Sequence, residues 1–329
     1  MLWVKKDCQV FLYLYTKINL LKKSTFLVLV LCSVCSAQDY IDLFKISYIE
    51  NYNHRYENTA QSTNIESIEA DLTIPFQVDE KNTIITGFLY SQNSLSLFPL
   101  EELYSPLQSQ NTTLYSTTLK IGINRSLNEK WTGALIFLPK FSSDYKDVSV
   151  GDFFWGGFSL FKYKKNERLS YKFGAVVIQQ TYGIVAVPIF GLYYKSVDQK
   201  LELDLTLPVT ADVNYKMNPT TTFGINYYGI GRSYDIHQNN TPDYYIGYAS
   251  LEFSTYLQYS VFNNSILLRG KFGYATFSGG AYEEGDNIDV RIVGFFDIGG
   301  ERTRLNPGFS GAPFAKLEAV YRFDFSKKK

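Results

Sequence analysis

The fold is decided by a stretch near the C-terminus that reads Ala315-Lys316-Leu317-Glu318-Ala319-Val320-Tyr321-Arg322-Phe323-Asp324-Phe325. Every second residue is apolar or aromatic, and most of the residues between them are charged. This period of two is typical of a β-strand with one apolar face and one polar face. The same alternation recurs along the chain, so the sequence predicts an all-β fold.

Four further segments show the alternation clearly, and they cover residues 65–76, 114–124, 201–215 and 249–259. In the third segment, leucines occupy positions 201, 203, 205 and 207, while Glu202, Asp204 and Thr206 lie between them. A slip of one residue would move the carboxylates onto the apolar face, so the register of these strands is strongly specified.

Composition indicates that the apolar face is in contact with lipid. Aromatic residues make up 17% of the chain, with 27 Tyr and 25 Phe against 3 Trp. A transmembrane barrel needs many amphipathic rings at its two membrane interfaces, whereas globular cores prefer aliphatic side chains. The mean hydropathy of -0.13 hides this character, because apolar and polar residues alternate and cancel. We therefore predict a transmembrane antiparallel up-and-down β-barrel.

The first residues have the features of a secretory signal peptide. Several lysines precede the apolar run Phe26–Leu31, which is followed by Cys35-Ser36-Ala37-Gln38. Small residues before the cut favour cleavage after Ala37, giving a signal peptide at 1–37 and a barrel domain at 38–329. An uncleaved anchor is the alternative, since residues 10–21 are also apolar, but no run reaches the roughly 20 residues of a spanning helix.

Removal of this leader changes the chemistry available to the chain. Cys8, Cys32 and Cys35 are the only cysteines of the whole chain, and all three lie in the leader. The mature protein would therefore contain neither disulfides nor a thiolate nucleophile. The leader also holds five of the 32 basic residues and one of the 32 acidic residues, which leaves 27 against 31. A net charge near -4 gives no indication of a nucleic-acid partner.

The connections between strands fall into two classes. Short polar turns are expected at 79–82, 127–130, 164–168, 196–200, 217–220 and 262–265, and longer segments at 50–64, 98–113, 142–151, 180–186, 235–243 and 278–312. Short periplasmic turns and long outer loops are typical of outer-membrane barrels. Six short turns with both termini periplasmic require 14 strands, provided that the chain turns tightly at Pro208. If Pro208 instead lies at a bulge or edge of one long strand, about 12 strands remain possible, and residues 288–296 could supply a missing strand.

Charged side chains on the polar face are the candidate functional residues. The predicted lumen-facing set is Glu69, Asp71, Lys120, Lys140, Glu202, Asp204, Asp212, Glu252, Arg269, Lys271, Glu318 and Arg322. They could form an eyelet whose field selects ions or solutes. Alternatively, opposite charges pair with one another and merely fill the interior.

No catalytic, cofactor-binding or metal-binding residue is predicted. The two histidines, His54 and His237, fall in expected outer loops. Asp235 and Asp243 lie near His237 in sequence and could complete a catalytic or metal site, but nothing fixes a second ligand at a defined spacing, so a solvated loop histidine is the preferred interpretation.

Several segments together resemble a known family. They are the leader end Ser36-Ala37-Gln38, the start Asp39-Tyr40-Ile41-Asp42-Leu43-Phe44, residues 70–75 and 114–120, and the ending Tyr321-Arg322-Phe323-Asp324-Phe325. The family comprises Gram-negative outer-membrane β-barrels and is classed only as a domain of unknown function. The resemblance implies an outer-membrane location and a lipid environment, and it transfers no site residues. The final strand also resembles the signal read by the barrel assembly machinery, although Ser326 to Lys329 follow its last aromatic residue.

These observations favour a pore- or transport-type barrel for a small solute. A structural or adhesive barrel with ligand-binding loops is the alternative. An outer-membrane enzyme is less favoured, because histidine is scarce and the mature chain lacks cysteine, and we predict no enzymatic activity and no cofactor.

Overall fold

The computed structural model describes residues 40–98, 112–237, 244–293 and 296–324. The expected signal peptide and its cleavage site lie outside this part of the chain. Across the described residues, no helix has the length and apolar character needed to cross a membrane.

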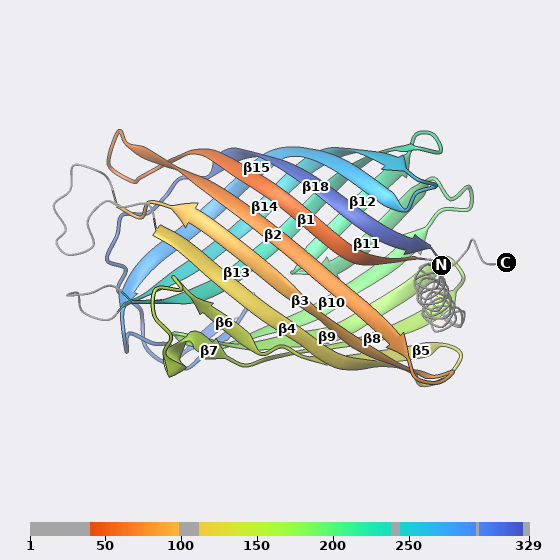
Figure 1. Cartoon of the computed structure of the whole chain (residues 1–329), viewed down its shortest axis with the longest axis horizontal. Helices are drawn as coiled ribbons and strands as arrows, with labels where there is room; N and C mark the ends of the chain where they lie inside the picture. The colour runs from red at the N-terminus through yellow and green to blue at the C-terminus, as the bar shows by residue number, and fades with distance from the viewer. Residues whose placement is uncertain (1–39, 99–111, 238–243, 294–295, 325–329) are drawn as a thin grey trace, which may run out of the picture.

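The described chain forms a closed antiparallel barrel of 14 wall strands, which run obliquely to its long axis (Figure 1). Twelve unbroken strands account for most of the wall: β1 (Tyr40–Arg55), β2 (Ser62–Gln77), β3 (Asn82–Leu95), β4 (Thr112–Ser126), β9 (Leu169–Gln180), β10 (Gly183–Lys195), β11 (Leu201–Leu207), β12 (Thr210–Lys216), β13 (Thr221–Ile236), β14 (Tyr244–Val261), β15 (Ile266–Glu283) and β18 (Ala312–Asp324). The two remaining wall strands are each interrupted once. β5 (Trp131–Phe137) continues as β6 (Lys140–Ser143), and β7 (Phe153–Phe154) continues as β8 (Gly156–Asn166).

The barrel closes where the last strand meets the first. β18 pairs with β1 from Tyr40 and Asp324 to Asn51 and Phe314, with one register shift between Asp42 and Phe44. On the other side β18 pairs with β15. Closure leaves no free sheet edge along this seam, as a hydrocarbon environment requires.

The predicted faces are confirmed by the side-chain exposures. Ile121, Leu135 and Leu317 point outward and are 51%, 63% and 68% exposed, whereas Lys316 and Glu318 on the opposite face are 6% and 5% exposed. Alternation along each strand therefore separates a lipid-facing surface from a polar lumen.

All six short turns are confirmed, and a local hydrogen bond stabilises several of them. The side chains of Asn128, Asn166 and Asn218 each accept N–H groups from the residues two and three positions later, and Asp79 does the same in the first turn. This Asx geometry lets the backbone reverse direction within a few residues. We call the end of the barrel that carries these turns the turn end and the opposite end the loop end.

The 14-strand interpretation of Pro208 is confirmed. The chain turns tightly between β11 and β12, and Leu201 to Thr206 pair with Thr210 to Tyr215. The 12-strand alternative is wrong. Residues 288–296 supply no wall strand, since the short β16 (Val290–Ile292) and β17 (Phe296–Ile298) form a hairpin within the connection between β15 and β18.

Two connections expected to be long are shorter. β1 extends to Arg55 and β2 begins at Ser62, while Gln180 and Gly183 pair directly across a tight turn. The sequence analysis placed Asn51 and His54 in an outer loop. Both side chains are instead buried inside the barrel, because an inward-facing strand position can hold a polar residue.

Candidate functional site in the barrel lumen

The lumen narrows sharply at the loop end because β13 crosses toward the opposite wall. Asp235 of β13 pairs with Ser143 of β6 in a parallel bridge. The Ser142 hydroxyl donates to the Ser233 carbonyl at 2.7 Å, and the Thr181 amide donates to the Ser233 hydroxyl at 2.9 Å. These contacts join strands that lie far apart around the wall, so β13 divides the loop end of the lumen.

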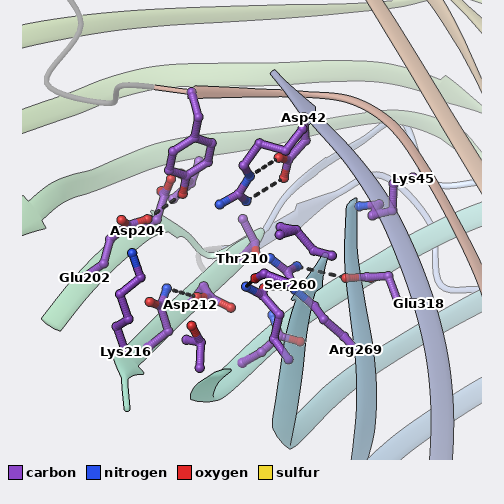
Figure 2. Close-up of a pocket in the computed structure, with 18 of the residues that line it drawn as sticks. Asp42, Lys45, Glu202, Asp204, Thr210, Asp212, Lys216, Ser260, Arg269 and Glu318 are labelled. Carbon is purple, nitrogen blue, oxygen red and sulfur yellow. Dashed lines mark hydrogen bonds and ion pairs between the residues drawn. The ribbon is translucent and has the colours of Figure 1, made fainter. Parts of the chain in front are cut away.

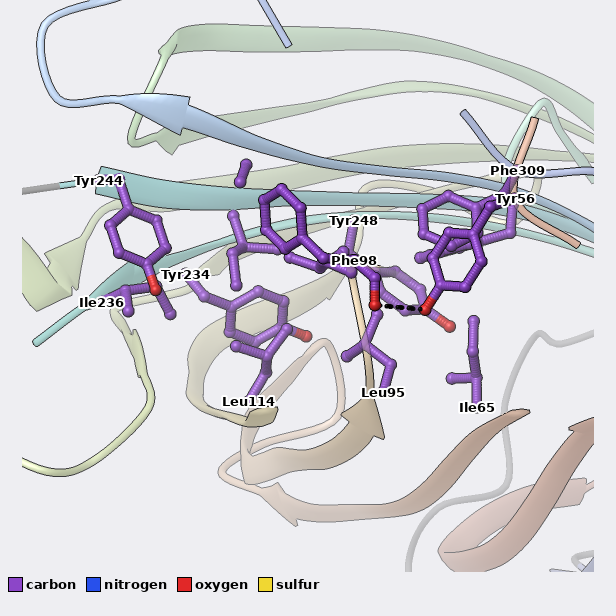
Figure 3. Close-up of a cluster of buried hydrophobic side chains, with 14 of the residues drawn as sticks. Tyr56, Ile65, Leu95, Phe98, Leu114, Tyr234, Ile236, Tyr244, Tyr248 and Phe309 are labelled. Atoms are coloured by element: carbon purple, nitrogen blue, oxygen red, sulfur yellow. Dashed lines mark hydrogen bonds between the residues drawn. The ribbon is translucent and has the colours of Figure 1, made fainter. Parts of the chain in front are cut away.

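On one side of β13 the lumen is filled by buried apolar side chains, which we call the apolar plug. Its members are Tyr56, Ile65, Leu95, Leu97, Phe98, Leu114, Ile230, Tyr234, Ile236, Tyr244, Ile246, Tyr248, Phe277, Ala281 and Phe309. Figure 3 shows side chains from several strands converging there, with the Tyr56 hydroxyl bonded to the Phe98 carbonyl at 3.1 Å.

Two buried hydroxyl groups of the plug, those of Tyr56 and Tyr234, are hydrogen-bonded. The Tyr234 side chain is fully buried, and its hydroxyl accepts a hydrogen bond from the Asn93 amide at 3.0 Å. The side-chain oxygen of Asn93 in turn accepts a hydrogen bond from the Ser67 hydroxyl at 2.8 Å. A cluster of buried apolar side chains packed in this way excludes water, so it closes this route through the barrel.

Below the plug lies a layer of ion pairs that we call the charge belt. Arg232 of β13 reaches Glu69 of β2 at 2.6 Å, and the Lys316 ammonium is 3.4 Å from the other Glu69 oxygen. Arg269 and Lys271 lie 2.9 and 3.2 Å from the two oxygens of Glu318. The Arg232–Glu69 pair spans the lumen, so the charge belt also fastens β13 to the opposite wall.

The turn end of the lumen contains a polar vestibule of about 730 Å³ (Figure 2). Arg322 forms two hydrogen bonds with Asp42, at 2.6 and 3.0 Å, and the Tyr40 hydroxyl bonds to Glu202. Lysine and arginine supply ten of the lining residues, whereas aspartate and glutamate supply six. The vestibule therefore carries an excess of positive charge, although many of its charges are paired.

The structure brings most of the predicted lumen charges together. Eight of them line the vestibule: Glu69, Glu202, Asp204, Asp212, Arg269, Lys271, Glu318 and Arg322. Asp71 and Lys140 line a second cavity of about 220 Å³. Lys120 pairs with Asp71, and Glu252 is buried with one oxygen 4.0 Å from Lys316.

Sequence reasoning omitted several lumen cations, namely Lys45, Lys162, Lys172, Arg232 and Lys316. The sequence contained a usable signal for these cations, because alternation along each strand places them on the inward face. In the observed register Lys162 faces Lys172, and Lys316 faces Lys271. Both predicted roles remain compatible with this arrangement, since paired charges and surplus cations share one cavity.

The two histidines differ from the expected solvated loop residues. His54 belongs to β1, is 1% exposed, and its Nδ1 lies 2.9 Å from the Ser310 carbonyl oxygen, so the loop interpretation is wrong for it. His237 follows β13, and its Nε2 is 2.8 Å from an oxygen of Asp152 in the short helix η1 (Val150–Asp152). Asp243 lies outside the described residues.

Asp152 and Asp235 surround the His237 ring. One ligand atom from each of the three side chains lies within 4.8 Å of the others. Burial opposes a charge on the ring, but the hydrogen bond to Asp152 and the nearby carboxylates outweigh it and raise the pKa of His237. The arrangement is that of an ion pair holding η1 against the end of β13.

Fold and lumen together define a transmembrane β-barrel with a charged interior and a narrowed loop end. The chain belongs to the family described as Domain of unknown function (DUF6268), whose model matches residues 33–289. No curated protein shows significant similarity to it.

Solved structures of outer-membrane barrels are similar in fold at low identity. The NanC porin is 10% identical, with 84% of this chain and 98% of that chain covered and a TM-score of 0.35. The toluene transporter TodX of P. putida is 11% identical, with 88% and 90% covered and a TM-score of 0.39. A bacterial polysaccharide outer membrane secretin is 8% identical, with 86% and 99% covered and a TM-score of 0.34.

Proposed function

We propose that this protein is a pore- or transport-type barrel of the outer membrane that admits small anionic solutes and is closed at its loop end in the conformation described. The observation that carries the proposal is the vestibule, where ten cationic and six anionic side chains line one cavity. Charges that share a narrow, poorly screened space with a permeating ion interact with it strongly.

The closed loop end determines how the barrel would work. The apolar plug blocks a direct path, and β13 is tied to β2 and β6 by the contacts described above. Conduction along the axis therefore requires movement of β13 or loss of plug side chains. We expect the wild-type barrel to conduct rarely.

A planar bilayer experiment tests the proposal with a plug variant, Tyr234→Ala combined with Phe277→Ala. Wild type should show brief, infrequent openings, whereas the plug variant should conduct steadily and prefer chloride over potassium. Glu202→Gln combined with Asp204→Asn, introduced into the plug variant, should shift the reversal potential further toward chloride, and Lys172→Gln should shift it back. A heat-modifiable plug variant that is silent, or that selects cations, would overturn the proposal.

The dry plug also favours a second function, a structural or adhesive barrel whose outer loops bind a partner. The loop end is held in place by the Asp152–His237 pair and by Asn306, whose side chain bonds to the backbone of Ala281 and Gly279 at 2.8 and 3.2 Å. Silence of the plug variant in the bilayer would support this alternative. Neither histidine favours an enzyme, since His54 is sealed in the barrel and His237 is engaged with Asp152.

A further inference from the structure

The barrel wall is incomplete between β10 and β13. The hairpin of β11 and β12 ends at Leu207 and Thr210, while β10 and β13 continue toward the loop end. β16 pairs with Ile184 to Ala186 of β10, and β6 pairs with Asp235 of β13. Within the described part of the chain, no strand pairs with the facing edges of residues 187–189 and 230–232, and we call this interval the wall gap.

The residues at the edges of the wall gap suit an unpaired position. Pro188 has no backbone N–H to satisfy. Gly231 is exposed, and a Cβ atom built there would meet no atom within 4 Å. Unpaired backbone at hydrocarbon depth is costly unless it lines a cavity. Gly229, Ile230 and Gly231 line the cavity of about 220 Å³, which therefore reaches the wall at the gap.

An apolar surface faces the lumen next to the wall gap. By the strand register, Ile136, Phe158, Leu160, Val176, Ile178 and Val187 share the inward face of β5, β8, β9 and β10. All six are half-buried, unlike the fully packed plug residues. We call this surface the apolar strip. The cavity of about 220 Å³ touches both the strip and the gap, since Ile178, Gly229 and Gly231 line it.

A cation lies at the turn-end border of the apolar strip. Lys162 follows Leu160 on the inward face of β8 and lines the vestibule. Its neighbour Lys172 pairs with Asp204, whereas the described residues provide no carboxylate within ion-pair distance of Lys162. An apolar strip ending at an unpaired ammonium group matches a ligand with an apolar tail and an anionic head.

We propose that the lumen binds an amphipathic anion, with its tail on the apolar strip and its head at Lys162, and that this ligand crosses the wall through the gap between β10 and β13. This inference deepens and rests on the proposed transport of anionic solutes, because it specifies their class and their route. The plug closes the axial path but leaves the strip accessible, so a sideways route avoids the need to unpack the plug.

Isothermal titration of octanoate into the barrel held in lipid nanodiscs tests the ligand class, with empty nanodiscs as the blank. Octanoate should bind at least tenfold more tightly than either acetate or n-octanol, because each lacks one of the two contacts. Lys162→Gln should weaken octanoate about tenfold and leave n-octanol unchanged. Lys130→Gln, at an exposed turn, is the matched control. Equal binding of the three probes would overturn the ligand class.

Stopped-flow exchange of octanoate tests the route. Gly231→Trp should slow association and dissociation together at least tenfold, whereas Gly270→Trp, where a Cβ also meets nothing within 4 Å, should leave both unchanged. If Gly231→Trp fails to fold, Gly231→Cys can be alkylated with a bulky maleimide after folding, since every native cysteine lies at or before position 35. Unchanged exchange in the blocked protein would overturn the route. Neither assay depends on conduction through the barrel. If octanoate binds as expected but the plug variant is silent in the bilayer, the proposed function fails while the inferred ligand class stands.

Discussion

Replacement of Glu69 by glutamine should release β13 from the opposite wall. Glu69 is the only carboxylate within ion-pair distance of Arg232 among the described residues, at 2.6 Å, and its second oxygen is 3.4 Å from Lys316. The side chains are 14%, 19% and 7% exposed, so the pairs are largely removed from water. Breaking a buried pair by removing one partner costs about 3 to 5 kcal/mol. Because Glu69 and Lys316 line the polar vestibule, we use the lower end, about 3 kcal/mol.

This cost falls on the closed conformation, in which Arg232 is held against β2. A loss of about 3 kcal/mol changes an equilibrium by roughly 150-fold, since about 1.4 kcal/mol corresponds to a factor of ten. Glu69→Gln should therefore raise the open probability in planar bilayers strongly and speed amide exchange in residues 230–236. Asp71→Asn is the matched control, because its pair with Lys120 joins strands within one wall and leaves β13 untouched. An open probability within twofold of wild type, or the same increase in Asp71→Asn, would refute the reasoning.

Three further changes test the faces, the packing and the loop anchor. Leu317→Lys, at mid-strand on the lipid face, should destabilise the barrel by about 2 to 4 kcal/mol in vesicle refolding titrations. Tyr321→Lys, beside the turn at Ser265, should cost about 1 kcal/mol or less, because it lies nearer the membrane interface. Equal costs would show that the depth of these two residues in the membrane is misassigned. Gly224→Ala should displace the Tyr256 ring, which lies 2.3 Å from the added Cβ, and cost about 1 to 3 kcal/mol, whereas Gly270→Ala should be neutral in the same titration. Because the pKa of His237 is raised, its ion pair with Asp152 stabilises the native loop fully below pH 6.5, and this contribution is lost as pH rises through the raised value. Proteolysis near residues 144–152 should therefore increase with pH in wild type. His237→Gln should show no such dependence.

The parts of the fold that follow from local rules could be predicted from the sequence. A residue's face in a strand depends only on its parity, so the outward positions of Leu203, Leu205 and Leu207 and the inward positions of Glu202 and Asp204 follow from alternation alone. The turns at Asn128, Asn166 and Asn218 are equally local, because each is stabilised by one side chain and the next few amides.

The narrowing of the lumen could not be predicted in this way. It depends on contacts between Ser142 and Ser233, and between Glu69 and Arg232, that join strands distant in sequence. Alternation places Tyr234 on the inward face of β13. It does not show whether the lumen around that side chain is open or filled by other side chains. The prediction of a loop position for His54 was wrong for a related reason. A polar residue near the end of a strand resembles a loop residue in sequence, and only the structure shows that its partner is the buried Ser310 carbonyl.

The contacts of β13 indicate that this one strand controls both routes through the barrel. Its inward face carries Arg232 in the charge belt and Tyr234 in the plug, so the axial path stays closed while those side chains remain bonded to Glu69 and Asn93. Its opposite face carries Gly231 at the wall gap and Ser233, which is bonded to Ser142 and Thr181 just above the gap. A shift of β13 toward β10 would therefore loosen the plug and narrow the gap together, because one rigid strand bears both sets of contacts. Axial opening by a shift of β13 and lateral access are thus expected to oppose each other, and Glu69→Gln, which releases β13, should exchange octanoate more slowly through the wall.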